Sequence, residues 1–147
     1  LRRVLRPRVM VYTAVLVLIC LALMASLMLR SPFKVDVVRD RGVLARLVED
    51  GWVENVYRLQ IMNTTEQLQR YRIVAVGLPD IRLEPLAEVS VEPAQARWVP
   101  VSVRVPPEAA AKVGPGAHRI DFSIERQASD AGSARTVVEK STFMVPR

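Results

Sequence analysis

The first part of the chain is continuously hydrophobic, whereas the rest alternates between hydrophobic and polar positions. Residues 9–29 contain no charged side chain. A helix of that length would be about 31 Å long, which matches a hydrocarbon core of roughly 30 Å. A segment that crosses a membrane has to satisfy its own backbone hydrogen bonds, and a helix does so. We therefore expect a transmembrane helix at 9–29, with a basic flank at 1–8 and a linker at 30–34.

A cleaved signal peptide is the alternative interpretation of this segment. The apolar region of a signal peptide is usually about 7 to 15 residues long and is followed by a small-residue cleavage site. Here Ala25-Ser26 is followed by further hydrophobic residues, Leu27, Met28 and Leu29. The pattern favours an uncleaved helix.

Past Ser31-Pro32 the pattern becomes that of short strands. Pro32 ends the helical region, because proline disfavours helical geometry at the residue before it. Hydrophobic residues then alternate with polar ones, and prolines and turn residues separate the runs. The expected strands are Lys34–Val38, Tyr57–Ile61, Arg70–Gly77, Ile81–Glu84, Glu88–Glu92, Val99–Val105, Arg119–Glu125 and Thr136–Val145.

Seven or eight short strands in one domain, residues 35–147, predict an all-β fold, a two-sheet antiparallel sandwich. A small barrel is the structural alternative. One helical turn is expected, at 107–112. The domain has no cysteine, so the Cys…Trp…Cys framework of antibody domains is absent and core packing has to hold the sheets together. Trp52 and Trp98 are candidates for the core or its rim.

The net charge of +6 belongs mainly to the start of the chain. Arg2, Arg3, Arg6 and Arg8 carry four of these charges; from Arg30 onward 17 basic and 15 acidic side chains leave only +2. The domain has no basic stripe interleaved with aromatic residues, so nucleic acid is not an expected partner. An anionic membrane surface would attract the arginines. Their density favours an N-terminus on the inner side of the membrane.

Three sulfur-containing side chains are the candidate metal ligands. Cys20, Met24 and Met28 lie at i, i+4 and i+8 and would share one face of the membrane helix. Soft sulfur ligands suit Cu(I). The alternative is that all three are ordinary apolar residues that face lipid or a neighbouring helix.

Other candidate residues favour structural roles. His118 is the single histidine and is expected to be a surface or packing residue. Asn63-Thr64-Thr65 matches a glycosylation sequon, but a turn between strands explains the same residues. Glu49 and Asp50 are expected in a loop before Gly51-Trp52. The sequence contains no phosphate-binding glycine loop, no Cys-x-x-Cys pair and no Ser/His/Asp set, and we expect no catalytic or cofactor-binding residue in this chain.

The pattern as a whole resembles a known family. A helix is followed directly by RSPFKVDVVRDR at 30–41, then by GWVENVY at 51–57 and LQIMNTT at 59–65. These segments are similar to the C-terminal part of the FixG/CcoG-type cytochrome c oxidase accessory proteins, and the resemblance covers nearly the whole chain.

The resemblance implies a protein of the bacterial inner membrane with several helices, a cytoplasmic polyferredoxin region and an immunoglobulin-like domain in the periplasm. It implies a role in assembly of cbb3-type cytochrome oxidase, through electron transfer that reduces copper. The expected partners are the membrane and a periplasmic protein, either an oxidase subunit or a copper-delivery factor.

The cysteine content of this chain departs from the family pattern. Ferredoxin-type 4Fe-4S clusters need several cysteines, and Cys20 is the single cysteine here. The clusters are therefore expected only upstream, on residues missing from this sequence. Because the chain opens at Leu1, we expect it to be a fragment. The alternative function is a stand-alone anchored sandwich that acts as a scaffold or binding module with no redox role.

Overall fold

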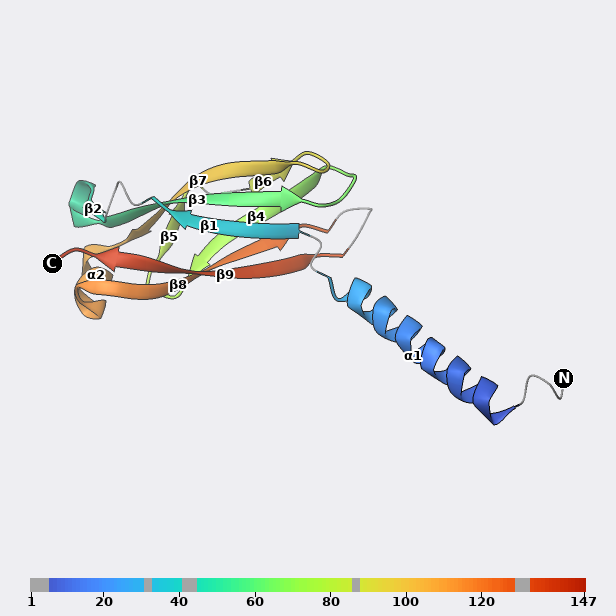
Figure 1. Cartoon of the computed structure of the whole chain (residues 1–147). Coiled ribbons are helices and arrows are strands. Elements are labelled where there is room, and N and C mark those ends of the chain that lie inside the picture. Colours follow the sequence, from blue (N-terminus) through green and yellow to red (C-terminus); the bar gives the residue numbers. More distant parts are fainter. Residues whose placement is uncertain (1–5, 31–32, 41–44, 86–87, 129–132) are drawn as a thin grey trace. The chain divides into compact units, whose positions relative to one another are not determined.

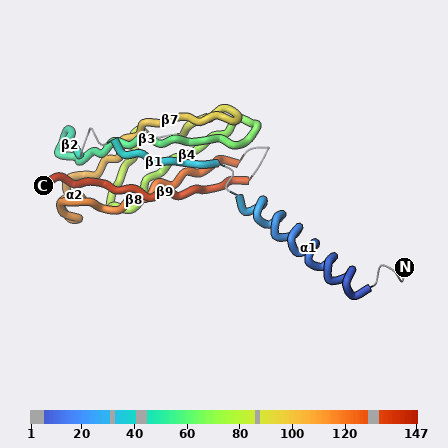
Figure 2. The backbone as a smooth tube through the Cα atoms, viewed as in Figure 1, coloured from blue at the N-terminus to red at the C-terminus, as the bar shows by residue number. Residues whose placement is uncertain are grey.

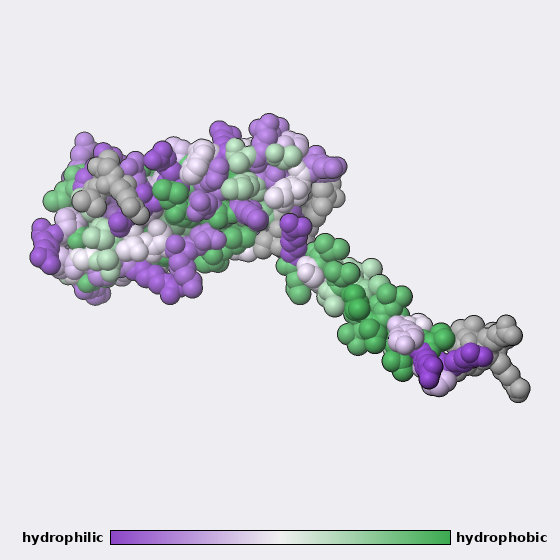
Figure 3. Space-filling model, in the orientation of Figure 1, coloured by the Kyte–Doolittle hydropathy of each residue, from purple (hydrophilic) through white to green (hydrophobic). Residues whose placement is uncertain are grey.

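The computed structural model describes residues 6–30, 33–40, 45–85, 88–128 and 133–147. The chain divides into two compact units, residues 1–31 and 32–147. The described residues of the first unit form the helix α1 (Pro7–Met28), which begins at a proline, a residue well suited to the first helical turn. The helix has no buried residue, and by length and composition it can cross a membrane. Figure 3 shows hydrophobic side chains along this helix.

The second unit is built almost entirely from strands (Figure 1). Its elements in chain order are β1 (Phe33–Arg39), β2 (Arg46–Leu47), the 3-10 helix η1 (Glu49–Gly51), β3 (Val53–Asn63), β4 (Gln69–Val76), β5 (Arg82–Glu84), β6 (Glu88–Val91), β7 (Ala96–Val105), α2 (Pro107–Val113), β8 (Gly116–Arg126) and β9 (Arg135–Val145).

The strands of the described residues form two antiparallel sheets. The first sheet has the order β1-β3-β7-β5, with β2 paired to β3, and the second has the order β6-β4-β8-β9. The edge strands β1 and β9 contact each other across the open side of the two sheets, and Figure 2 shows them side by side. The expected fold class, an immunoglobulin-like antiparallel sandwich preceded by one helix, is confirmed.

Alternation of side chains explains how the core forms. Val99, Val101, Val103 and Val105 all point inward from β7 and are buried, as a period of two predicts. Large side chains on the strands of the facing sheet also point inward and are buried. Two aromatic pairs lie at the centre: Phe33 against Tyr71, with ring centroids 4.8 Å apart, and Tyr57 against Phe122, at 5.0 Å. Aromatic pairs at this separation stabilise the fold by more than the burial of their surface area alone.

Several elements differ in extent from the sequence expectation. β1 begins at Phe33, two residues before the expected start of the domain, because Phe33 itself is buried against Tyr71. The two-residue strand β2 was not expected. The helical turn expected at 107–112 is present as α2.

Two side chains of β3 hold the edge strand of the other sheet. The Asn55 side chain donates from Nδ2 to the Met144 carbonyl at 2.9 Å and accepts from the Met144 N–H at 3.0 Å. Two residues further along β3, the Tyr57 hydroxyl donates to the Thr142 carbonyl at 2.8 Å. Asn55 and Tyr57 are two residues apart on β3, and their partners Met144 and Thr142 are two residues apart on β9. Both side chains therefore bond backbone groups on the same edge of β9.

The turn between β3 and β4 is built around Asn63. This side chain is only 2% exposed. Its Nδ2 donates to the carbonyls of Gln67, Val91 and Glu92, and its Oδ1 accepts from the N–H and hydroxyl of Thr65. A buried amide with these partners is a turn residue, so the turn interpretation of the sequon is confirmed.

Candidate functional site

A row of charged residues crosses the outer face of the first sheet. The strand register places Arg46 of β2 opposite Glu54 of β3, Glu54 opposite Arg104 of β7, and Arg104 opposite Arg82 of β5. Each of the four strands thus contributes one charged side chain to the same row. Glu84, two residues beyond Arg82, lies diagonal to Arg104.

Glu54 is the centre of this row. Arg46 donates from Nε to Oε1 at 2.6 Å, and Arg104 donates from Nε to Oε2 at 2.6 Å. Arg104 also pairs with Glu84, with 2.6 Å between Nη1 and Oε2. The two arginines cover the carboxylate so completely that it is 1% exposed, although it lies on the outer face.

The ionisation of Glu54 follows from two opposed causes. Burial by itself raises the pKa of this carboxyl group. The hydrogen bonds from Arg104 and Arg46, together with their positive charges, outweigh burial and hold the pKa of Glu54 below its ordinary value. The carboxylate is therefore charged at neutral pH and holds both arginines in place.

A short loop beside this row forms one wall of a recess. The loop runs through η1, where Asp50 and Gly51 adopt positive φ angles of 60° and 76°. Asp and Gly are among the residues that tolerate this conformation. The Val48 N–H donates to the Trp52 carbonyl at 2.9 Å, and the Gly51 N–H donates to the Val48 carbonyl at 3.2 Å. The tight turn therefore presents the side chains of Glu49, Asp50 and Trp52 from a fixed backbone.

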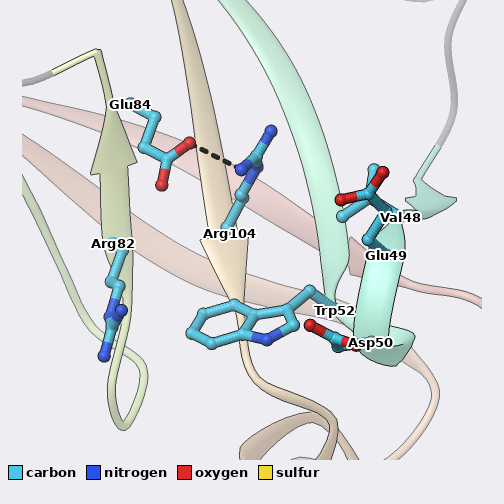
Figure 4. A pocket seen from close by; sticks show the side chains of 7 residues that line it. All are labelled: Val48, Glu49, Asp50, Trp52, Arg82, Glu84 and Arg104. Atoms are coloured by element: carbon cyan, nitrogen blue, oxygen red, sulfur yellow. Dashed lines mark ion pairs between the residues drawn. The ribbon is translucent and has the colours of Figure 1, made fainter.

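The recess lies between this loop and strands β5 and β7. It has a volume of about 550 Å³ and is lined by Val48, Glu49, Asp50, Trp52, Arg82, Glu84 and Arg104. The Arg82 guanidinium lies over the indole of Trp52, 5.0 Å from the ring centroid. In Figure 4 the Arg82 side chain, from β5, lies beside the indole of Trp52, and the ion pair of Glu84 and Arg104 is drawn above the indole.

The chemistry of the recess is that of recognition by charge and aromatic contact. Arginine, carboxylate and indole groups line it. Among the residues that the structure describes, no three histidine, cysteine, aspartate or glutamate side chains form a group that could hold a metal ion. The charged and aromatic lining suits the recess to binding a charged ligand.

The predicted sulfur candidates lie in the other unit. Cys20 is a free, exposed thiol on α1, and Met24 and Met28 are 60% and 72% exposed. The helix places the three on one face, with Cα atoms of successive members separated by about 6 Å along the axis. Whether they bind copper stays a prediction.

The remaining candidates have plain structural positions. The His118 Nε2 lies 2.7 Å from the Gly114 carbonyl and, in the tautomer with hydrogen on Nε2, donates to it. Trp98 is 51% exposed on the outer face of β7. Glu49 and Asp50 lie in a loop as expected. The sequence did not predict that Arg82 and Arg104 lie near Glu49 and Asp50. The pairing of β5 with β7 brings Arg82 beside Arg104, and no local sequence pattern reveals that pairing.

Comparison with known proteins places the chain in a family of immunoglobulin-like domains. A family model described as the IG-like fold at the C-terminus of FixG matches residues 23–146. This is most of the chain and includes the whole sandwich. The chain belongs to this family of immunoglobulin-like FixG C-terminal domains.

Individual relatives agree with this assignment. The crystal structure of a FixG-related protein from Vibrio parahaemolyticus has a TM-score of 0.65 and 27% identity; the match covers 78% of this chain and 97% of that one. Protein RdxB of Cereibacter sphaeroides is 33% identical over 82 residues, which are 56% of this chain and 17% of RdxB. An α2-macroglobulin from Escherichia coli, at 18% identity and a TM-score of 0.53, shares the fold alone.

Proposed function

We propose that the sandwich is the periplasmic interaction domain of an iron–sulfur electron-transfer accessory protein that serves assembly of cbb3-type cytochrome c oxidase. The observation that carries the proposal is the family match, which runs from within α1 through the end of the sandwich. Membership of the FixG family suggests oxidase assembly as the process. Copper reduction and delivery, with the redox part on upstream residues, is the chemistry we propose for the whole protein.

An interaction role suits what the domain offers to a partner. The face seen in Figure 3 carries many charged and polar side chains, and the recess beside Trp52 has a fixed loop on one side and the charged row on the other. These are features that recognise another molecule. The helix α1 would tether the sandwich to the membrane that also holds the oxidase, so an oxidase subunit or a copper-delivery factor could meet it there.

The test of this proposal removes the sandwich from the full-length protein in its native host. Deletion of Val35–Arg147 is expected to lower the amount and activity of assembled cbb3 oxidase in membranes. A matched control replaces the same residues with an unrelated periplasmic domain, which preserves translocation of the tail. Loss in both variants supports the proposal. Normal oxidase activity in either variant, with the truncated protein present at its usual level, would contradict it.

The side of the membrane is tested separately. The arginines before α1 favour an inner N-terminus, and a long domain can translocate in spite of positive charges near the helix. In a Cys20→Ser background, Thr136→Cys on β9 should react with a membrane-impermeant maleimide in spheroplasts, whereas Arg6→Cys should react only after lysis. The reverse labelling pattern would place the sandwich in the cytoplasm.

A second candidate role concerns the sulfur face of α1, where copper would be cargo. Because a metal–sulfur bond is about 2.3 Å long, two sulfurs on one ion lie within about 4.6 Å. Neighbouring pairs at i, i+4 suit this, since their Cβ atoms are about 5 to 6 Å apart. All three sulfurs cannot bind one ion, because Cys20 and Met28 are about 12 Å apart along the helix. Substitution of all three by leucine should lower copper reduction by the full protein; an unchanged rate would remove this role.

A further inference from the structure

The recess beside Trp52 differs from the charged row next to it in how its charges are satisfied. In the row, Glu54 binds two arginines and Arg104 binds two carboxylates. In the recess, neither Glu49 nor Asp50 has a hydrogen-bond or ion-pair partner for its side chain within the described part of the chain. The charge of Arg104 attracts Glu49 at longer range, but both carboxylates are without a direct partner among the described residues.

Arg82 occupies the indole face without a carboxylate partner of its own among the described residues. Its register partner is Arg104, a like charge, which disfavours an approach of the two guanidinium groups. The carboxylates of Glu54 and Glu84 are already paired with Arg104. The contact that remains for Arg82 is the ring of Trp52, and Arg82 is exposed to solvent.

This contact is weak enough to be exchanged. A cation over an indole at an exposed site changes an equilibrium by a factor of roughly two to five. A second cation that reached the ring would have the same attraction to the indole and also the attraction of Glu49 and Asp50. The lining carries three acidic groups (Glu49, Asp50, Glu84) against two basic ones (Arg82, Arg104), a net charge of −1.

We propose that this recess binds an arginine or lysine side chain from a basic segment of a partner protein, and that Arg82 holds the indole face of Trp52 until the partner side chain replaces it. The inference rests on the proposed interaction role and names the chemistry of the partner. Two unpaired carboxylates and a net negative lining argue against an anion, which would find Arg82 as its one available cation among the described lining residues.

The chain carries an internal reference for the test, because it has two tryptophans. Trp52 lines the recess, and Trp98 lies exposed on β7, where it is not part of the recess lining. In a nitrogen-15 NMR spectrum of the full chain in detergent micelles, each indole N–H gives its own signal. The probe is the basic nonapeptide (Gly-Arg-Ser)₃ amide at low salt, and the acidic nonapeptide (Gly-Glu-Ser)₃ amide is its control.

The basic peptide is expected to shift the Trp52 indole signal in a saturable way and to leave that of Trp98 in place. The Kd should rise with salt, because screening weakens contacts between exposed charges. Arg82→Gln should tighten binding roughly two- to fivefold, since it removes the competing cation. Arg58→Gln, on the outer face of β3, makes the same change of net charge away from the recess and should have little effect.

The acidic side of the site is tested with Glu49→Gln and Asp50→Asn. Asparagine suits the positive φ at position 50, so the loop should keep its fold. Each change should weaken binding by roughly threefold, and Glu125→Gln on β8 is the matched control. A Trp52 signal that stays unshifted even in Arg82→Gln would overturn the inference. So would an equal response to the acidic peptide, or an equal shift of Trp98.

This experiment contains no oxidase, so its failure is distinct from failure of the proposed function. Impaired oxidase assembly after deletion of Val35–Arg147, combined with no peptide binding, would leave the interaction role and remove this site. Peptide binding in a protein whose deletion leaves the oxidase intact would keep the site and remove the oxidase role.

Discussion

The buried amide of Asn63 fixes a turn that would otherwise have several unpaired backbone groups. Its two donor hydrogens serve three carbonyls, and its oxygen accepts from Thr65. Since Asn63 is 2% exposed, any replacement has to satisfy the same groups without water. This makes Asn63 a sensitive position for stability.

Asn63→Asp should destabilise the sandwich by about 3 kcal/mol or more, because it removes all three donations and buries a carboxylate beside carbonyl oxygens. Glu66→Gln in the same turn is the control and should change the free energy of unfolding little. Both are measured by guanidinium denaturation of the full chain in detergent. Equal stability of Asn63→Asp and the parent protein would disprove the buried position of this amide.

Glu54 makes the stability of the sandwich depend on pH. Its pKa in the folded protein is below the ordinary value of 4.5. The unfolded chain therefore takes up the proton first as the pH falls, and the stability that Glu54 contributes is present above pH 4.5 and is lost as the pH falls through the folded pKa. We expect this acid loss of stability to be smaller in Glu54→Gln.

At neutral pH, Glu54→Gln should lower the free energy of unfolding by about 2 kcal/mol, as expected for charge-assisted hydrogen bonds. The effect is below that of a fully buried ion pair, because Arg46 is 55% exposed. Glu88→Gln, which breaks the exposed pair with Arg72, should have a much smaller effect. An equal response of the two variants would contradict the central place of Glu54 in the row.

The residue pattern could not have revealed the environment of Glu54. A period of two places this glutamate on the outer face of β3, where glutamate is normally solvated. Its burial comes from Arg46 and Arg104, which are 8 and 50 residues away in sequence. The recess could not be predicted for the same reason. The loop of Glu49 and Asp50 was predictable from its turn residues, but its proximity to Arg82 depends on how β5 pairs with β7.

Among the elements, the strands with long alternating patterns were the predictable ones. The valines of β7 and the pattern of β8 each cover several residues, so the period of two is unmistakable. The strand β2 has two residues, Arg46 and Leu47, and no period can be read from two positions. The pairing of strands into two sheets was predictable as a class, whereas the register was not.

The edge strand β9 depends on two side chains of the opposite sheet. Asn55→Ala should cost about 3 kcal/mol, because it leaves both the N–H and the C=O of Met144 without their partner. Tyr57→Phe keeps the ring and removes one hydrogen bond, so it should cost about 1 kcal/mol. Hydrogen exchange at Met144 should also accelerate in Asn55→Ala. Unchanged exchange there would show that Asn55 does not hold the edge.

The helix α1 is expected to insert in the membrane through its uninterrupted apolar length. Leu18→Arg, near its middle, should raise the insertion free energy by about 3 kcal/mol. The protein should then be extracted more readily from membranes by alkaline carbonate, while Leu18→Ala should remain in the membrane fraction. Retention of Leu18→Arg equal to that of the parent would argue that α1 is not the membrane anchor.

At the scale of the whole molecule, the chain corresponds to one part of its longer relative. The matched segment covers 17% of RdxB, whereas the FixG-related crystal structure from Vibrio parahaemolyticus is covered almost completely. The sandwich is a module with its own core, and we propose that the redox chemistry of the family resides on other residues of a longer protein. The central claim of the proposed function is that this sandwich and an upstream iron–sulfur region belong to one protein.

The most direct measurement of this claim is the intact mass and iron content of the native protein, purified from membranes through a tag placed after Arg147. The account predicts a species much heavier than 16.5 kDa that carries iron, because the sandwich would be the tail of an iron–sulfur protein. An iron-free species near 16.5 kDa would contradict it, and the chain would then be an anchored sandwich without a redox part.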